Sequence, residues 1–324
     1  MLLDGWSTPF LFQEFFLFYE AFCQSKDIDL DQPRPYRDYI AWLRDQDLTE
    51  AERFWTRTLR GFTATTQLGG EIISASSAAK PAAFAEQNLH LSADTTSALY
   101  AFTRRYQVTV HTIMQGAWSL LLSRYSGEQD VVFGMIVSGR PPELKEADTI
   151  VGLFVNTLPV RIAVSEESRL LPWLKQIQQE QAEARQYEYS PLVEIQRWSE
   201  VPRGMPLFNS ILAFANYPTQ SSAPRHDRTL EVHNIESVER TNYSITVGVI
   251  PGTEMLLKIV YDVRRFLPDT IGQMLDSFRD ALESILLRPE QRLGDVSLHA
   301  ETQGHFLESP SADRAGDDIE QFKF

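Results

Sequence analysis

A continuous run of apolar residues at positions 131–137, Val-Val-Phe-Gly-Met-Ile-Val, is the feature that most constrains the fold. The run is rich in residues that favour β-structure, and it shows no alternation between apolar and polar positions. A strand with one face in water would alternate, so this pattern indicates a strand that is buried on both faces. The chain therefore needs further layers of structure to cover that strand.

Helices are predicted before and after this strand along the chain. Ser92 and Thr109 are favourable N-cap residues for two helices, and the second of these should end before Gly127. Amphipathic periodicity predicts a later helix at residues 171–187, and a last helix is predicted at residues 268–287.

Three further strands are predicted at residues 211–214, 244–250 and 255–261. Pro251 and Gly252 separate the last two strands and are typical of a hairpin turn. Helices and strands that are mixed in this way indicate a layered α/β or α+β fold.

The N-terminal part of the chain is predicted to be helical. Residues 10–22 carry aromatic side chains on more than one side of a helix, which indicates a buried helix, and Cys23 beside them is expected in the core. Residues 49–52, Thr-Glu-Ala-Glu, have the pattern of a capping box that opens a second helix, which carries Phe54 and Trp55.

Charge and composition exclude several classes of function. The net charge of -14 argues against nucleic-acid binding, which needs a basic face. No apolar run has the length of a membrane span, and the first residues lack the basic start of a signal peptide. A single cysteine excludes a disulfide framework within the chain and fits a reducing compartment, so we expect a cytoplasmic protein without membrane association.

General catalytic motifs do not identify an active site. The six histidines show no HxxxH or HExxH spacing, and the chain has no G-x-S-x-G, P-loop or dinucleotide-binding pattern. His111 follows the predicted cap Thr109, where it could act as a catalytic group or be a partly exposed residue of the first helical turn. Composition and general motifs leave both interpretations open.

A series of short motifs resembles the conserved motifs of one family. Residues 3–7, Leu-Asp-Gly-Trp-Ser, match the end of an H-H-x-x-x-D-G-W-S signature, and residues 36–42 are similar to Y-x-D-[FY]-A-x-W. Ser-Gly-Arg-Pro at 138–141 and Val-Gly-Leu-Phe-Val-Asn-Thr-Leu-Pro-Val-Arg at 151–161 match a G-x-F-V-N-T block. Weaker matches follow at residues 190–194, 206–208 and 261–266. In this order and spacing, the motifs resemble the condensation domains of nonribosomal peptide synthetases.

The resemblance implies a fold of two subdomains, each similar to chloramphenicol acetyltransferase, with a tunnel between them. It also implies amide bond formation between aminoacyl or peptidyl groups that carrier proteins hold as thioesters. The groups are carried on phosphopantetheine arms of these partners, so no directly bound cofactor is expected. Adjacent synthetase modules or an upstream part of the protein are the other expected partners. The G-L-F-V-N-T block favours condensation over epimerisation domains.

The resemblance assigns Asp4 and Gly5 to the remnant of the catalytic H-H-x-x-x-D-G motif. Counted back from Asp4, both signature histidines fall before Met1, so the sequence leaves enzyme activity undecided. In the family, the aspartate pairs with an arginine and holds the catalytic loop. That arginine could belong to a preceding part, or it could be Arg140.

Trp42 and Asn156 match motif positions near the substrate tunnel, although both could serve packing alone. Gly152, Phe154 and Arg161 are expected to be scaffold for the segment that bridges the two subdomains. The domain organisation follows from the resemblance and from composition: residues 1–62 end an incomplete first subdomain, 63–83 form a linker, 84–299 form a complete second subdomain, and 300–324 form a disordered tail.

Two other functions stay open. The chain could be a non-catalytic docking module that keeps the scaffold and binds carrier proteins. It could also be another acyltransferase of the same superfamily, but those enzymes use H-x-x-x-D without the G-x-F-V-N-T block.

Overall fold

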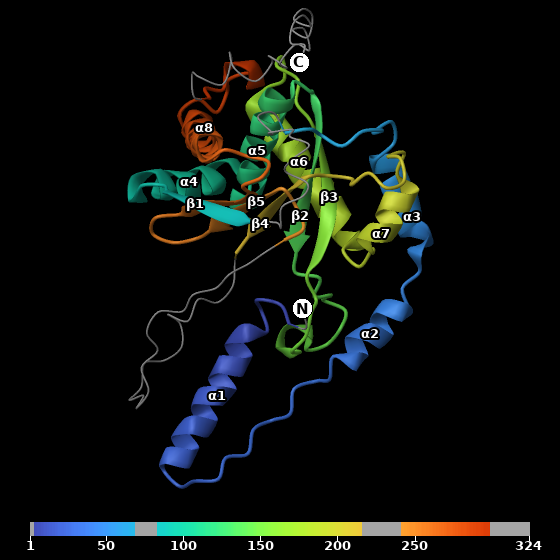
Figure 1. Cartoon of the computed structure of the whole chain (residues 1–324), viewed down its shortest axis with the longest axis vertical. Coiled ribbons are helices and arrows are strands. Elements are labelled where there is room, and N and C mark those ends of the chain that lie inside the picture. The colour runs from blue at the N-terminus through green and yellow to red at the C-terminus, as the bar shows by residue number, and fades with distance from the viewer. Residues whose placement is uncertain (1–2, 69–82, 216–240, 299–324) are drawn as a thin grey trace, which may run out of the picture.

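The computed structural model describes residues 3–68, 83–215 and 241–298, and its centre is a six-stranded mixed sheet (Figure 1). The strand order is β1-β6-β5-β4-β2-β3. The strands are β1 (Phe84–His90), β2 (Asp130–Val137), β3 (Asn156–Ala163), β4 (Ser210–Phe214), β5 (Ile245–Ile250) and β6 (Leu256–Asp262). The tail predicted at 300–324 and most of the linker predicted at 63–83 lie outside the described residues.

Strand β2 is the buried strand that the apolar run predicts. It pairs antiparallel with β3 and parallel with β4, and most of its residues are buried. Strand β4 also runs parallel to β5, whereas β5 and β6 form the antiparallel hairpin predicted around Pro251 and Gly252. Strands β1 and β3 were not predicted, and both lie at edges of the sheet.

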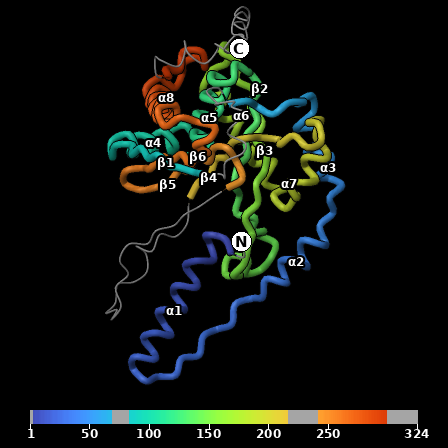
Figure 2. The backbone as a smooth tube through the Cα atoms, viewed as in Figure 1, coloured from blue at the N-terminus to red at the C-terminus, as the bar shows by residue number. Residues whose placement is uncertain are grey.

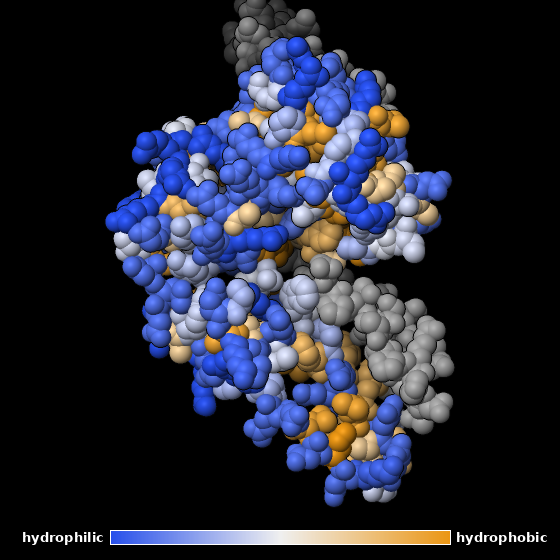
Figure 3. All heavy atoms as spheres, turned by 180° about the vertical axis from the view of Figure 1, so that it is seen from behind, coloured by the Kyte–Doolittle hydropathy of each residue, from blue (hydrophilic) through white to orange (hydrophobic). Residues whose placement is uncertain are grey.

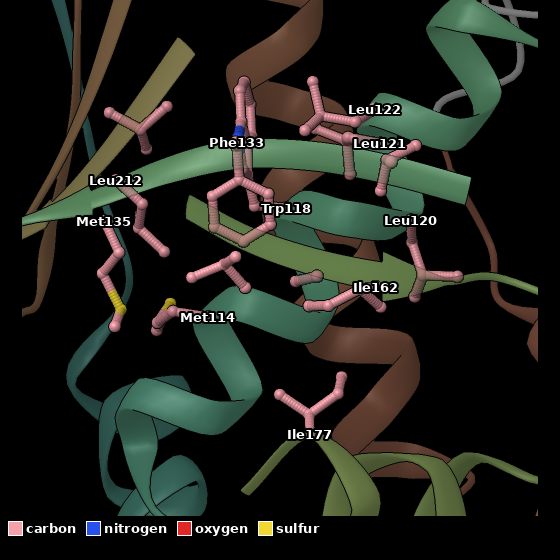
Figure 4. Packing of buried hydrophobic residues seen from close by; sticks show 14 of the residues in the cluster. Met114, Trp118, Leu120, Leu121, Leu122, Phe133, Met135, Ile162, Ile177 and Leu212 are labelled. Carbon is pink, nitrogen blue, oxygen red and sulfur yellow. The ribbon is translucent and has the colours of Figure 1, made fainter. Parts of the chain in front are cut away.

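A layer of helices packs on the sheet and forms the main core. It contains α4 (Ala93–Tyr106), α5 (Val110–Ser126), α6 (Leu170–Ala184) and α8 (Pro268–Leu287). Helix α5 contacts α6, α8 and β2, and Figure 4 shows its side chains facing Phe133 and Leu212 of the sheet. Burial of large apolar side chains, each of which stabilises the fold by roughly 1.5–3 kcal/mol, drives this arrangement.

The predicted helix caps are confirmed. Ser92 Oγ accepts a hydrogen bond from Thr95 N at 3.1 Å, and Thr109 Oγ1 accepts one from Thr112 N at 3.0 Å. Gly127 ends α5 in the left-handed region with a φ of 74°, where a residue without a Cβ is favoured.

Four more helices lie on the N-terminal side and beside the core: α1 (Thr8–Cys23), α2 (Arg37–Arg44), α3 (Leu48–Thr58) and α7 (Leu192–Trp198). The capping box predicted at Thr49 is wrong, because α3 starts earlier and its N-cap is Asp47, whose carboxylate accepts from Thr49 N at 2.9 Å. Helix α3 packs on α7 and joins the main core, while α1 and α2 extend away from the sheet (Figures 1 and 2). The domain boundary near residue 62 stays a prediction.

The expectation that α1 is a buried helix is wrong for the described chain. Phe16 is its one buried residue, whereas Phe15 is 55% and Phe22 is 76% exposed, and Cys23 is exposed as well. Apolar side chains project from several sides of this helix, and among them the described residues bury only Phe16. Figure 3 shows the resulting apolar surface on the arm that carries α1.

No helix among the described residues combines the length and the apolar character that a bilayer crossing requires.

Candidate functional site

The carboxylate of Asp4 is buried at the turn that precedes α1. Its Oδ1 accepts hydrogen bonds from Ser7 N at 2.9 Å and Ser7 Oγ at 2.7 Å, and its Oδ2 accepts one from Phe154 N at 3.1 Å. Gly5 lies within this turn. Because the carboxylate is surrounded by donors, Asp4 holds the turn in one conformation.

Arg140 is the partner of Asp4, which the sequence left undecided between this residue and a preceding part. Its Nη2 lies 3.1 Å from Asp4 Oδ1 and 3.3 Å from Oδ2, and both side chains are almost completely buried. Its Nη1 donates to the carbonyl oxygen of Ile150 at 3.0 Å, and its guanidinium lies 4.2 Å from the ring centre of Phe154. Removing one member of such a pair would leave an uncompensated buried charge.

A second set of contacts ties the same turn to the segment around Gly152. Ser7 Oγ accepts from Gly152 N at 3.0 Å, and Asp4 N donates to Gly152 O at 3.1 Å. Glycine is required at this point, because a Cβ on Gly152 would lie 2.1 Å from a ring atom of Tyr36. The D-G-W-S and G-L-F-V-N-T motifs are therefore one structural unit, although about 145 positions separate them.

An aromatic cluster attaches α2 to this unit. Tyr39 packs on Phe154 with 4.2 Å between ring centres, and Trp42 stacks on Tyr39 at 6.1 Å. Trp42 also meets the ring of Tyr189 at a right angle and 6.2 Å. Burial raises the pKa of Tyr39 to about 12, so its hydroxyl stays protonated at neutral pH.

A cavity of about 620 Å³ lies beside Trp6, the residue that follows Gly5. Its walls combine apolar side chains, among them Met135, Val137 and Phe214, with polar ones. The polar lining residues include Tyr100, Thr109, His111, Ser138, Arg185 and Glu188. A concave site of this size with a few polar groups is typical of small-molecule binding.

His111 contributes a neutral imidazole to this cavity. Its ring stacks on Phe214 with 5.4 Å between centres, and its Nε2 is buried without a hydrogen-bond partner among the described residues. Burial, with a smaller contribution from Arg185, lowers the pKa of His111 to about 4. The residue lies in the first turn of α5, and sequence reasoning did not place it beside the D-G-W-S turn.

Asn156 begins β3 and fixes a loop of the cavity wall. Its Nδ2 donates to the carbonyl oxygens of Glu188 and Ser190, both at 2.8 Å, and its Oδ1 accepts from Thr157 N at 2.9 Å. Neither Asn156 nor Trp42 is among the described residues that line the cavity. Glu188 does line it, and no sequence motif pointed to this residue.

Among the residues that the structure describes, no three His, Cys, Asp or Glu side chains form a cluster that could hold a metal ion.

Comparison with known proteins agrees with these motifs. The family model described as "Condensation domain" matches residues 1–307. The chain is 44% identical to a subunit of the linear gramicidin synthase of Brevibacillus parabrevis over 308 residues, which cover 95% of this chain and 6% of that protein. It is 37% identical to chondramide synthase cmdD of Chondromyces crocatus over 294 residues, which cover 90% of this chain and 7% of that protein. The chain thus spans only a small part of these relatives.

Solved structures show the same fold. The X-domain from teicoplanin biosynthesis superposes with a TM-score of 0.77 at 19% identity, covering 92% of this chain and 70% of that chain. The starter condensation domain of rhizomide synthetase superposes with a TM-score of 0.69 at 17% identity, covering 92% of this chain and 66% of that chain. The sheet and its helices are thus those of the chloramphenicol acetyltransferase-like fold. The match over almost the whole sequence shows that this chain belongs to the condensation-domain family of nonribosomal peptide synthetases.

Proposed function

We propose that this chain takes part in amide bond formation between two aminoacyl, peptidyl or acyl groups, each held as a thioester on a carrier protein. The observation that carries this proposal is the rigid D-G-W-S turn beside the 620 Å³ cavity. Asp4, Arg140, Ser7 and Gly152 hold that turn through buried contacts. A turn of this kind can present a preceding side chain to a bound substrate in a fixed orientation.

The reaction requires an amine to attack the thioester carbonyl. A C–N bond forms, the C–S bond breaks, and a proton passes from nitrogen to the leaving thiol. The family resemblance assigns proton transfer or stabilisation of the tetrahedral intermediate to the signature histidine. This chain contains no two adjacent histidines, so the proposal includes a histidine pair immediately upstream of the described turn.

The site residues have separate roles in this proposal. Asp4 and Gly5 position the loop that carries the histidines, and Arg140 neutralises the Asp4 charge. Trp42 braces α2 against the bridging segment, and Asn156 shapes the wall of the substrate tunnel through its bonds to the Glu188 and Ser190 carbonyls.

The proposed partners are peptidyl or acyl carrier domains and neighbouring synthetase modules, which act together in the cytoplasm. Phosphopantetheine arms bring the substrates as part of these partners, and the chain binds no cofactor of its own. We further propose that residues 1–62 end one subdomain and that 84–299 form the second, so that the cavity beside Trp6 belongs to the tunnel between them.

The proposal is tested by comparing two forms of the protein. One is the 324-residue chain, and the other is the same chain preceded by the segment that lies before the matched region in the gramicidin synthase relative. Each form is incubated with two loaded carrier proteins, and the amide product is measured by mass spectrometry. We expect product from the extended form and a rate about 10²–10⁴-fold lower from the chain alone.

A variant of the extended form in which the histidine pair is replaced by alanine is the control for chemical background. Carrier binding without product in the intact extended form would contradict the enzyme proposal and favour the docking role. Equal rates for the chain with and without the histidines would show that the signature is not needed.

A further inference from the structure

Glu188 has an unusual position for a carboxylate. It follows the short 3-10 helix Arg185–Tyr187 that continues α6, and it lines the same cavity as Trp6. Among the described residues that line this cavity, it is the only acidic one. Glu188 and Trp6, a residue of the D-G-W-S turn, therefore line one cavity.

Two segments of the site hold Glu188 in place. Its carbonyl oxygen accepts the 2.8 Å hydrogen bond from Asn156 Nδ2, and its carboxylate interacts with the backbone N–H of Gly139. Gly139 has a φ of 63°, and a Cβ there would lie 1.9 Å from the carbonyl oxygen of Phe154. The close approach of these backbones fixes the loop that carries Glu188 relative to the Asp4 turn.

Among the described residues, the carboxylate of Glu188 forms no ion pair. The ion pairs there join other residues. Burial raises the pKa of Glu188, while Arg185 and the Gly139 backbone lower it by less. Since Arg185 itself is exposed, solvent screens its charge and leaves the carboxylate incompletely neutralised. A half-buried carboxylate in such a place gains from a ligand that carries positive charge.

We propose that Glu188 binds the protonated amine of the aminoacyl substrate in this cavity and accepts one proton from it. This inference rests on the proposed function, and it names the group that receives the nucleophile. The ammonium gives its proton to the carboxylate, and the neutral amine then attacks the thioester carbonyl. The C–N bond forms as the C–S bond breaks, one of the two remaining nitrogen protons passes to the thiolate while the other stays on the amide nitrogen, and Glu188 later releases its proton to water.

His111, Arg185 and the Asp4–Arg140 pair are less suited than Glu188 to bind an ammonium group. His111 on α5 is neutral because burial lowers its pKa to about 4, so it does not repel an ammonium group. Arg185 also lines the cavity, but its exposure to solvent weakens its repulsion of a bound cation. The buried Asp4 and Arg140 side chains neutralise each other. Glu188 is therefore the group in the described cavity wall that selects a primary ammonium.

The test uses the 324-residue chain and two stable probes, alanyl aminopantetheine and its N-acetyl derivative, which replace the thioester by an amide. Only the first probe carries an ammonium group. Affinities are measured by isothermal titration calorimetry for the wild type, Glu188→Gln, Glu188→Asp and the exposed control Glu180→Gln. We expect Glu188→Gln to weaken binding of the amine probe about 10- to 100-fold, because one charge-assisted hydrogen bond is lost. Binding of the N-acetyl probe should change by less than about threefold.

The ratio of the two affinities is the decisive quantity, since it does not depend on the fraction of folded protein. Glu188→Asp should keep part of the preference for the amine, and Glu180→Gln should keep all of it. If the wild type and Glu188→Gln discriminate equally between the probes, the assignment of Glu188 is wrong while the proposed function stands. If the wild type binds neither probe, the assignment of Glu188 is contradicted, while the proposed function is still decided by product formation in the extended form.

Discussion

The guanidinium of Arg140 lies 3.1 Å from the carboxylate of Asp4, although 136 positions separate the two residues. The pair connects the turn before α1 to the loop that follows β2. Its side chains are 4% and 0% exposed, so each charge depends on the other.

Arg140→Ala should therefore destabilise the protein strongly. Loss of one member leaves the Asp4 charge buried without its partner, which typically costs about 3–5 kcal/mol. The free energy of unfolding is measured by urea titration. The control is Arg197→Ala, which removes a surface partner of Glu194 and should cost about 0–1 kcal/mol. Similar losses in the free energy of unfolding for both substitutions would show that the buried pair contributes no more to stability than the surface pair.

Asn156→Ala tests the link between β3 and the loop of Glu188 and Ser190. The substitution removes two donors to carbonyl oxygens, so we expect a loss of about 1–3 kcal/mol in the free energy of unfolding. In the form extended upstream, turnover per folded molecule should also fall, because the cavity wall is no longer held. A loss of stability with normal turnover would assign Asn156 to the scaffold alone.

Gly152→Ala should force the bridging segment away from α2. The new Cβ would lie 2.1 Å from a ring atom of Tyr36, and overpacking of this kind costs typically about 1–3 kcal/mol. Gly272→Ala on α8 is the matched control, because its Cβ would lie 3.5 Å from Gln87 Oε1, at ordinary contact distance. Alanine should stabilise that helix by about 0.5–1 kcal/mol. Opposite signs in thermal or urea unfolding are the expected result.

His111 should make stability depend on pH. Its pKa is about 4 in the folded protein and 6.5 in the unfolded chain, so the unfolded state binds more protons between these values. The contribution is complete above about pH 6.5 and decreases as the pH falls, by about 3 kcal/mol at pH 4. His111→Asn should remove this part of the pH dependence. Unfolding curves of wild type and variant between about pH 4 and 7.5 measure the difference, and parallel curves would contradict the prediction.

The exposed face of α1 should promote self-association. Phe18 and Phe22 stack on each other at 6.4 Å and are 38% and 76% exposed, and an apolar surface of this kind marks an interaction or aggregation site. Replacing both by serine should lower dye binding and light scattering, while the free energy of unfolding changes by at most about 0.5 kcal/mol per site. The isolated exposed Val193, replaced by serine, is the control and should change neither signal.

The local elements of this fold are readable from the sequence because their causes lie within a few residues. The apolar run of β2 and the caps Ser92, Thr109 and Gly127 depend on neighbours along the chain, and the structure confirms them. The edge strands were harder to predict. Strand β1 is mostly polar, and β3 contains Pro159, which edge strands tolerate because they have a free side.

The sequence alone determined the family and the secondary structure around the buried strand, because motifs and capping patterns are local. It did not determine how much of α1 would be covered by other elements, and the described structure leaves Cys23 exposed. Only the tertiary structure decided that Arg140 neutralises Asp4 and that Asn156 holds the loop of Glu188. These contacts join residues far apart in the chain, and their energies depend on burial, which exists only once the layers have packed.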